Sequence, residues 1–390
     1  MELAGSLGDL GSLLPIAIAM VLVNGIDPVG LFLSFGLTYV LTGLYFGITV
    51  PVQPMKVIGA YAIATGLDAD RILASSLLMA AVLLVVGVTG AIDVIRKMTP
   101  KAVITGVQLS TGAMLVAGGV KFVMGTSRFQ AFQGGAEPFL TWQSLGPVPI
   151  GLVVGGLAGL ATLLFLDNKK YPAGLVVVAT GLVTGLILGA RIDLGGGGFS
   201  PSLPKILAGG FPAKGDFTFA LLVLVVPQLP MTLGNAVLAY TDLSEKYFVD
   251  RALKVTNRQA CVSMALANFL GFFLGGIPMC HGAGGLAAHF RFGSRTAGSN
   301  LWIGFILMAL ALLLGENIIG FLKIMPMSIL GVLLVFAGAQ LAMTIMDLDS
   351  RKDYFVATLI LGVTLASNLA VGFIVGMILA HFLRWKNLSI

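Results

Sequence analysis

The sequence predicts an all-α polytopic membrane protein with about fourteen transmembrane segments in a seven-plus-seven inverted repeat. Composition is the first indication: hydrophobic residues make up 57% of the 390 residues, charged residues only 10%, and the mean hydropathy is +0.99. The second is that long apolar runs are separated by Gly, Pro and short charged clusters. These runs lack the period-two alternation of barrel strands, so helices are favoured. The third is that two of the segments are interrupted at corresponding places in the two halves.

The predicted segments follow one another with short breaks. We expect them at about 11–25, 29–47, 52–66, 70–96, 101–124, 148–166, 171–190, 217–240, 255–275, 279–290, 297–315, 318–345, 353–367 and 369–386. Segments three and ten are too short to cross a bilayer as complete helices. Each follows a stretch broken by Pro or Gly, and such paired interruptions point to a transporter binding site.

Basic residues predict the orientation of the chain in the membrane. Of the 23 Lys and Arg residues, fifteen fall in loops assigned to the inside and seven in loops assigned to the outside, and Lys56 lies within a span. An excess of Lys and Arg marks cytoplasmic loops, so both termini are expected in the cytoplasm. The protein is expected in the plasma (inner) membrane. Residues 1–10 have no basic n-region, so no cleaved signal peptide is expected.

The stretch from residue 50 to residue 60 places two prolines, an amide and a lysine in an otherwise apolar run. We expect Pro54 to open a helix at its first position, with Gln53 just before it. The N–H groups of Met55, Lys56 and the next residue would then have no partner in the helix. Together with the helix dipole and the Lys56 charge they predict an anion site. Snorkelling of Lys56 to the membrane surface is the alternative, which its place in an interrupted helix disfavours.

Segment eight carries a similar pattern, with prolines at 227 and 230. Gln228, Thr232 and Asn235 have the spacing i, i+4, i+7 and would share one face of a helix. Polar groups at membrane depth need partners, and an oxyanion would supply them. Ordinary interhelical hydrogen bonding is the alternative.

Segment ten begins with His281-Gly282-Ala283-Gly284. Such small residues would let an anion approach the backbone N–H groups at a helix start. His281 is expected to donate a hydrogen bond, and a titrating role in proton coupling is the alternative.

Acidic residues are not expected inside the predicted membrane core. Those nearest to it lie close to segment ends: Asp27, Asp93, Asp242 and Glu316. A buried cation without an acidic partner favours an anionic substrate over a cationic one.

Several classes of protein are excluded by what the sequence lacks. The two cysteines, Cys261 and Cys280, lie in apolar surroundings and indicate neither a disulfide framework nor a metal site. No nucleophile–base pair stands out, so we expect neither an enzyme nor a cofactor. The net charge of +6 is explained by cytoplasmic loops and does not require nucleic acid as a partner.

Two motifs resemble the signature motifs of the molybdate transporter family, a branch of the sulfate permease superfamily. They are Pro-Val-Gln-Pro-Met-Lys at 51–56 and Pro-Gln-Leu-Pro-Met-Thr at 227–232. The region 278–296 is similar to the tenth-helix region of sulfate permeases, and the resemblance covers nearly the whole chain. The chain ends soon after its last span, so we expect the C-terminal regulatory domain of sulfate permeases to be missing. Many sulfate permeases have a basic residue early in helix ten, near Gly285 of this chain, so the resemblance assigns the positive charge to Lys56.

The resemblance implies a core domain (helices 1–4 and 8–11) and a gate domain (helices 5–7 and 12–14). The expected regions are first-repeat core 1–100, first-repeat gate 101–195, an extracytoplasmic Gly/Pro linker 196–216, second-repeat core 217–316 and second-repeat gate 317–390. The oxyanion would lie between the starts of helices three and ten, flanked by helices one and eight. The candidate substrate-binding residues are Gln53, Met55, Lys56, Gln228, Thr232, Asn235, His281, Gly282, Ala283 and Gly284.

The resemblance implies a secondary transporter for molybdate, embedded in the lipid bilayer, and a homodimer. Sulfate and tungstate remain alternatives, because tetrahedral oxyanions are geometrically alike. An anion channel with the same architecture is a second interpretation. A nucleobase carrier is a third, but it would need carboxylates in segments eight and ten, where the sequence has none.

Overall fold

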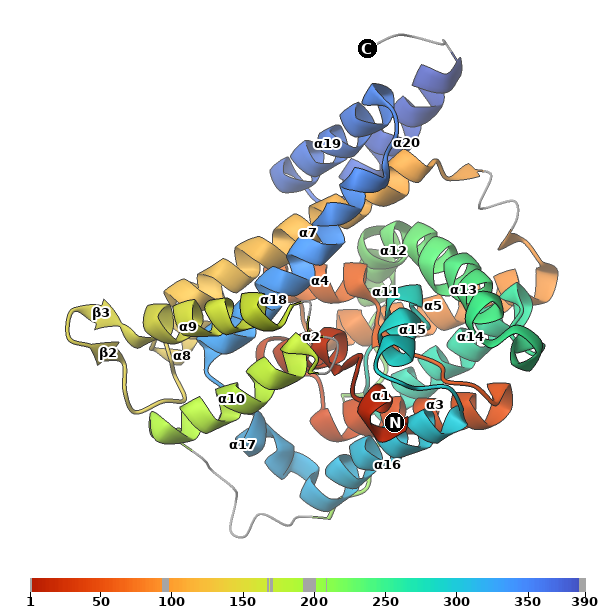
Figure 1. The fold of residues 1–390 in the computed structure, drawn as a ribbon. Helices are drawn as coiled ribbons and strands as arrows, with labels where there is room; N and C mark the ends of the chain where they lie inside the picture. Colours follow the sequence, from red (N-terminus) through yellow and green to blue (C-terminus); the bar gives the residue numbers. More distant parts are fainter. Residues whose placement is uncertain are drawn as a thin grey trace.

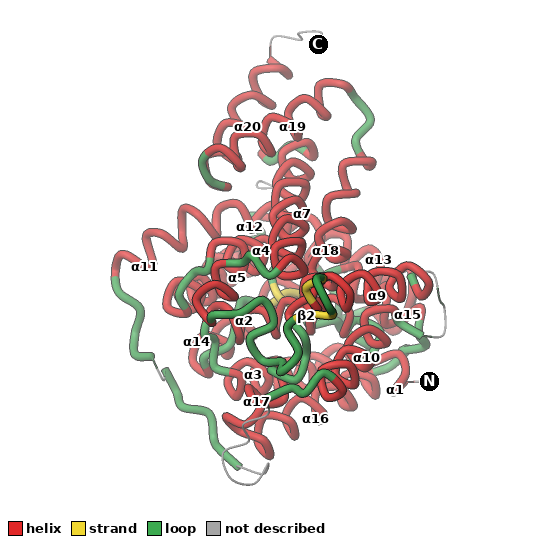
Figure 2. The backbone as a smooth tube through the Cα atoms, turned by 90° about the vertical axis from the view of Figure 1, so that its left-hand side faces the viewer, coloured by secondary structure: helices red, strands yellow, loops and turns green. Residues whose placement is uncertain are grey.

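A computed structural model describes residues 2–92, 98–166, 168, 171–191, 201–207 and 209–385. In this part of the chain nearly all regular structure is helical, and loops and two small strand pairs connect the helices (Figures 1 and 2). The helices of the first half are α1 (Glu2–Ser6), α2 (Leu10–Asn24), α3 (Pro28–Phe46), α4 (Lys56–Thr65), α5 (Ala69–Thr89), α7 (Lys101–Met124), α8 (Arg128–Gln133), α9 (Ile150–Phe165) and α10 (Ala173–Ile187). Those of the second half are α11 (Lys214–Phe219), α12 (Val226–Met231), α13 (Ala239–Phe248), α14 (Asn257–Leu274), α15 (Ala283–Arg291), α16 (Ala297–Leu314), α17 (Ile318–Leu322), α18 (Met327–Ala342), α19 (Arg351–Ala366) and α20 (Leu369–Trp385).

The helices fit a multi-pass membrane protein. Among the described residues, six helical stretches are long and apolar enough to cross a bilayer, and five shorter apolar helices accompany them. Every predicted segment contains a helix of the structure, but some boundaries differ. Segment twelve is broken at Pro326, which precedes α18, because proline cannot continue the preceding turn. The end of segment four and the four glycines of the linker lie outside the described residues.

Segment eight belongs to a helical stretch that runs without a break from Lys214 to Phe248. Within it, α12 is flanked by two π-helical stretches, Ala220–Val225 and Thr232–Leu238. Pro227 and Pro230 lack the N–H group that a regular α-helix uses, and wider π turns accommodate the freed carbonyl groups. The prolines therefore change the turn width and do not end the helix.

Close helix contacts connect the two halves of the chain. α7 lies along α18 (Figure 1), α3 packs on α16, and α5 packs on α14. Glycines allow the first of these contacts: a Cβ atom at Gly112 would lie 2.5 Å from the Gly338 oxygen, and one at Gly331 would lie 2.5 Å from the Gly119 oxygen. Small residues at such positions let transmembrane helices approach closely, so side chains here would push the halves apart.

The extended pieces before α4 and α15 meet in the interior of the bundle. Strand β1 (Gln53–Pro54) pairs antiparallel with β4 (Met279–Cys280), and both strands are buried. The Met55 N–H donates to the Pro278 oxygen at 2.8 Å, and the Asn268 side chain binds both backbone groups of Met279. Non-helical backbone at membrane depth is tolerated because protein groups satisfy it in this way.

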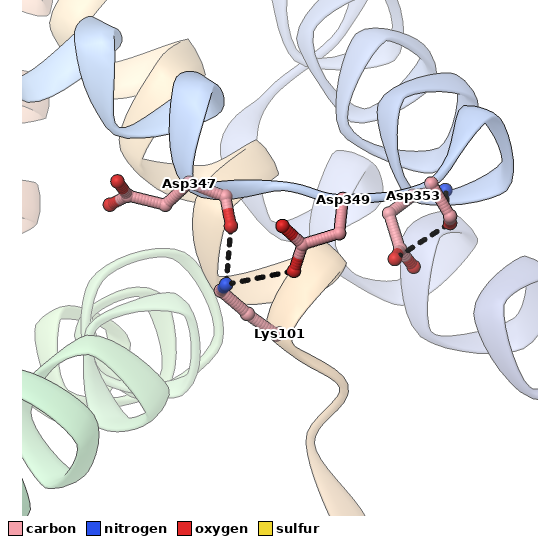
Figure 3. Close-up of polar contacts among 5 residues, drawn as sticks. Lys101, Asp347, Asp349 and Asp353 are labelled. Atoms are coloured by element: carbon pink, nitrogen blue, oxygen red, sulfur yellow. Dashed lines mark hydrogen bonds and ion pairs between the residues drawn. The ribbon is translucent and has the colours of Figure 1, made fainter.

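A polar contact at the surface links the start of α7 to the connection between α18 and α19 (Figure 3). The Lys101 ammonium donates to the Asp347 carbonyl and lies 3.8 Å from the Asp349 carboxylate. These two charged side chains are 60% and 95% exposed. Exposed pairs contribute about 0–1 kcal/mol, so this contact orients the connection and adds little to stability.

Glu137 is a buried carboxylate that caps a helix of the other half. It is 1% exposed, and its two oxygens accept the N–H groups of Met327 and Ser328 at 2.7 and 2.9 Å. We expect Glu137→Ala to lower the stability of the purified protein by about 2 kcal/mol or more, because two buried donors lose their acceptor. The measurement is thermal unfolding in detergent, with Glu316→Ala as the control at a carboxylate that is 71% exposed. Equal losses in both variants would contradict the capping role.

Candidate functional site

The candidate site is a cavity of about 350 Å³ where α2, α4 and α15 meet helices α7, α9, α10 and α18. Three of the predicted residues line it: Lys56, Asn235 and Gly284. The other polar residues of the lining are Ser12, Gln108, Thr162, Asn168, Arg291, Gln340 and Thr344. No Asp or Glu of the described chain is part of this lining, so its formal charges are positive.

Lys56 is the first residue of α4, a helix of 10 residues, and its side chain is partly buried. In the part of the chain that the structure describes, its ammonium group makes no hydrogen bond and no ion pair within 4.0 Å. A charge at this depth is costly unless a partner satisfies it, and the N-terminus of α4 adds its own positive potential. The arrangement can attract an anion into the cavity. The prediction that Pro54 opens the helix is wrong by two residues, because Gln53 and Pro54 are held extended in β1.

Gln228 occupies one of the three backbone donors that the sequence had assigned to a ligand, the N–H group of Val57, and it also binds the N–H group of Ile58. Its Oε1 accepts the N–H groups of Val57 at 3.0 Å and Ile58 at 3.3 Å, and its Nε2 donates to Thr232 Oγ1 at 2.8 Å. Gln228 and Thr232 are both 1% exposed and do not line the cavity. The amide therefore acts as a cap for α4 supplied by α12.

An acidic residue that the sequence analysis did not single out, because it precedes the first predicted segment, lies close to the site. Asp9 is 1% exposed, and its Oδ1 accepts from Gln53 Nε2 at 2.6 Å and from Ser12 Oγ at 2.9 Å. Asp9 precedes the first predicted segment, and the turn between α1 and α2 brings it back against β1. It fixes the Gln53 amide and places a carboxylate within electrostatic reach of Lys56.

Glycines allow the start of α15 to lie directly against these side chains. A Cβ atom at Gly285 would be 2.6 Å from Asp9 Oδ2 and 2.8 Å from Gln53 Nε2, and one at Gly282 would overlap Gln53 Oε1. A Cβ atom at Gly284 would meet nothing within 4 Å, because that position faces the cavity. A basic side chain therefore does not fit at Gly285 unless Asp9 and Gln53 move.

His281 uses both ring nitrogens within the protein. Nδ1 lies 2.9 Å from the Pro51 oxygen, and Nε2 lies 2.9 Å from Ser263 Oγ. A carbonyl oxygen only accepts, so Nδ1 carries the proton and Nε2 accepts from the serine hydroxyl. The ring is fully buried, and it holds the segment before α4 against α14.

The structure thus divides the ten predicted residues into two groups. Lys56, Asn235 and Gly284 line the cavity; the residues that do not line it are Gln53, Met55, Gln228, Thr232, His281, Gly282 and Ala283. Gln108 of α7 and Gln340 of α18 are lining residues that the sequence analysis missed. Each is an amide inside an apolar run, which is the signal that had already singled out Gln228 in segment eight.

The fold is similar to that of two solved membrane proteins. It is similar to the transmembrane domain of a cyanobacterium bicarbonate transporter BicA, with a TM-score of 0.64, 17% identity, and coverage of 97% of this chain and 96% of that one. It is also similar to murine Solute Carrier 26 family member A9, an anion transporter in the inward-facing state. That match has a TM-score of 0.66, 16% identity, and coverage of 100% of this chain and 69% of that one.

The sequence identifies the family. Residues 1–115 and 220–341 match the family described as "Molybdate transporter of MFS superfamily". The chain is 32% identical to Molybdate transporter 2 of Arabidopsis thaliana, with coverage of 100% of this chain and 88% of the relative. It is 30% identical to Molybdate transporter 1 of Chlamydomonas reinhardtii, with coverage of 97% and 90%. The chain belongs to the molybdate transporter family, which confirms the predicted resemblance and the expectation that it is a transporter and not an enzyme.

Proposed function

We propose that this protein is a secondary transporter that binds molybdate in the cavity beside Lys56. One observation carries the proposal. The Lys56 ammonium group lies at the start of α4 and makes no ion pair among the described residues, and the cavity that it lines has no described carboxylate in its lining. Asn235 and the backbone at Gly284 would add hydrogen bonds to the oxyanion from the opposite side. The names of the relatives support molybdate as the substrate.

We further propose that the chain is a seven-plus-seven inverted repeat with about fourteen spans. The helix contacts support this arrangement, because a segment of the first half packs on the repeat equivalent of another segment, and the reciprocal contact also occurs. Segment two packs on segment eleven (α3 on α16) and segment four on segment nine (α5 on α14). Segments three and ten pair through β1 and β4, and segments five and twelve pair through α7 and α18. A two-fold relation between the halves produces this set of contacts.

In this proposal the anion lies between a core domain and a gate domain, with the region boundaries predicted from the sequence. The lining supports the assignment, since α2, α4 and α15 belong to the proposed core and α7, α9, α10 and α18 to the proposed gate. Movement of one domain past the other would carry the anion across the membrane. Two lining residues, Asn168 and Arg291, belong to loops assigned to the cytoplasm, so we infer an inward-open state in the plasma membrane with cytoplasmic termini.

Competition binding tests the substrate. Purified protein should bind molybdate, and unlabelled tungstate should displace it at lower concentration than sulfate, because tungstate matches molybdate most closely in size and charge. Protein in liposomes should show saturable molybdate uptake, whereas a non-saturating conductance would favour the anion channel. Stronger displacement by sulfate would overturn the molybdate assignment and leave an oxyanion transporter of another specificity.

Gln228 gives a test that separates capping from substrate contact. Gln228→Ala should lower stability by about 1–2 kcal/mol, because two N–H groups of α4 lose their acceptor. Gln228→Glu keeps an acceptor for α4 but places a negative charge near Lys56, so molybdate affinity should fall about threefold or more. Thermal unfolding and molybdate binding of both purified variants are the measurements. Unchanged stability of Gln228→Ala would contradict the capping role.

A further inference from the structure

A second cavity lies on the outside of the bundle, between α3 and α14. Its volume is about 570 Å³, and it shares no lining residue with the cavity at Lys56. Thr38, Leu41 and Tyr45 line it on α3, and Val262, Leu266 and Leu270 line it on α14. Leu41, Tyr45 and Leu266 are 58%, 49% and 59% exposed. We call this cavity the α3–α14 groove.

The length of the α3–α14 groove matches one leaflet of a bilayer. Its lining on α14 runs from Gln259 to Leu270 at spacings of three and four residues, which form one continuous stripe. At 1.5 Å per residue this stripe is about 16 Å long. The hydrocarbon of a single leaflet is about 15 Å thick. An acyl chain that runs along the stripe would therefore fill the groove from the headgroup level to the middle of the membrane.

Basic side chains stand at one end of the groove, where α14 begins. The Lys254 ammonium donates to the backbone carbonyl oxygen of Tyr45 at 3.2 Å and lies 5.6 Å from the centre of the Tyr45 ring. Arg258 lies one helical turn before Val262, and both basic residues are exposed. The N-terminus of α14 adds positive potential at the same place. This end of the groove thus suits a negatively charged headgroup.

We propose that the α3–α14 groove binds an anionic phospholipid, with one acyl chain between the two helices and the headgroup phosphate on Lys254 and Arg258. Such juxtamembrane basic residues attract anionic lipids of the cytoplasmic leaflet. Ser263 also lines the groove, and its hydroxyl contacts His281, which in turn holds the Pro51 carbonyl. The bound lipid therefore lies against a residue that supports the segment before α4. The proposal is independent of which anion the transporter carries.

Native mass spectrometry of the full-length protein tests the proposal. The protein is equilibrated in detergent with equal amounts of phosphatidylglycerol and phosphatidylcholine of identical acyl chains. We expect each chain to retain one phosphatidylglycerol molecule in preference to phosphatidylcholine. In the double variant Lys254→Gln, Arg258→Gln, the ratio of retained phosphatidylglycerol to retained phosphatidylcholine should fall about tenfold. The matched control Lys246→Gln, Arg251→Gln removes the same charge from exposed positions that precede Lys254 and the start of α14, and it should behave as the wild type.

A third variant tests the acyl chain separately from the headgroup. Leu41→Trp places an indole across the groove at an exposed position, so the retained lipid should be lost while thermal unfolding is unchanged. Equal retention by the two double variants, or full retention by Leu41→Trp, would overturn the proposal. Disulfide crosslinking between two copies of Leu266→Cys in liposomes would also overturn it, because a second copy would then cover the groove.

Discussion

Lys56→Ala is expected to weaken molybdate binding by about tenfold or more, which corresponds to about 1.4 kcal/mol. The physical reason is that the ammonium is partly buried in a cavity lined by no described carboxylate, where a charge interacts with an anion more strongly than it would in water. The measurement is the dissociation constant of molybdate for the purified variant, by titration calorimetry or equilibrium dialysis.

A suitable control for this variant is Lys205→Ala. Lys205 is 73% exposed and lies 3.0 Å from Glu316, away from the cavity, so its removal takes the same charge from the protein without touching the site. Molybdate affinity should not change in this control. Lys56→Arg keeps the charge but not the compact ammonium, and an intermediate affinity is expected. If Lys56→Ala binds molybdate as tightly as the wild type, the role assigned to this lysine is wrong.

The sequence predicted those parts of the fold that depend on the residue types of one short segment. Apolar runs located the helices, and prolines and glycines located the extended pieces before α4 and α15, because a residue without an N–H group or a side chain acts on its own backbone. The same reasoning placed Lys56 at a helix start. The error of two residues at Pro54 has a non-local cause, since pairing with Cys280 and Met279 keeps Gln53 and Pro54 extended.

Contacts between distant segments could not be predicted in this way. Gln228 was singled out as a polar residue in an apolar helix, but only the packing of α12 on α4 shows that it binds Val57 and Ile58. Asp9 was overlooked because it precedes the first apolar run, and the turn before α2 returns it to Gln53. A single sequence contains the residue types of such pairs but not their pairing.

Adjacent glycines at the start of α15 are expected to respond in opposite ways to the same substitution. Gly285→Ala should lower stability by about 1–3 kcal/mol, because its methyl group would lie 2.6 Å from Asp9 Oδ2 and 2.8 Å from the Pro51 side chain. Neither neighbour can shift easily, because Asp9 accepts a hydrogen bond from Gln53 and the Pro51 carbonyl accepts one from His281. Gly284→Ala should fold normally, because its methyl group would meet nothing within 4 Å.

Molybdate affinity should respond to the substitution at Gly284, which leaves stability unchanged. The Gly284→Ala methyl group enters the cavity beside the proposed anion position, so molybdate affinity should fall about threefold while thermal unfolding is unchanged. Gly284→Val removes more of the space and should lower the affinity further. Unfolding in detergent and molybdate binding, measured on the same preparations, separate the two effects. If Gly284→Val binds molybdate as the wild type does, the anion does not lie at the start of α15, and Lys56 must bind it from another part of the cavity.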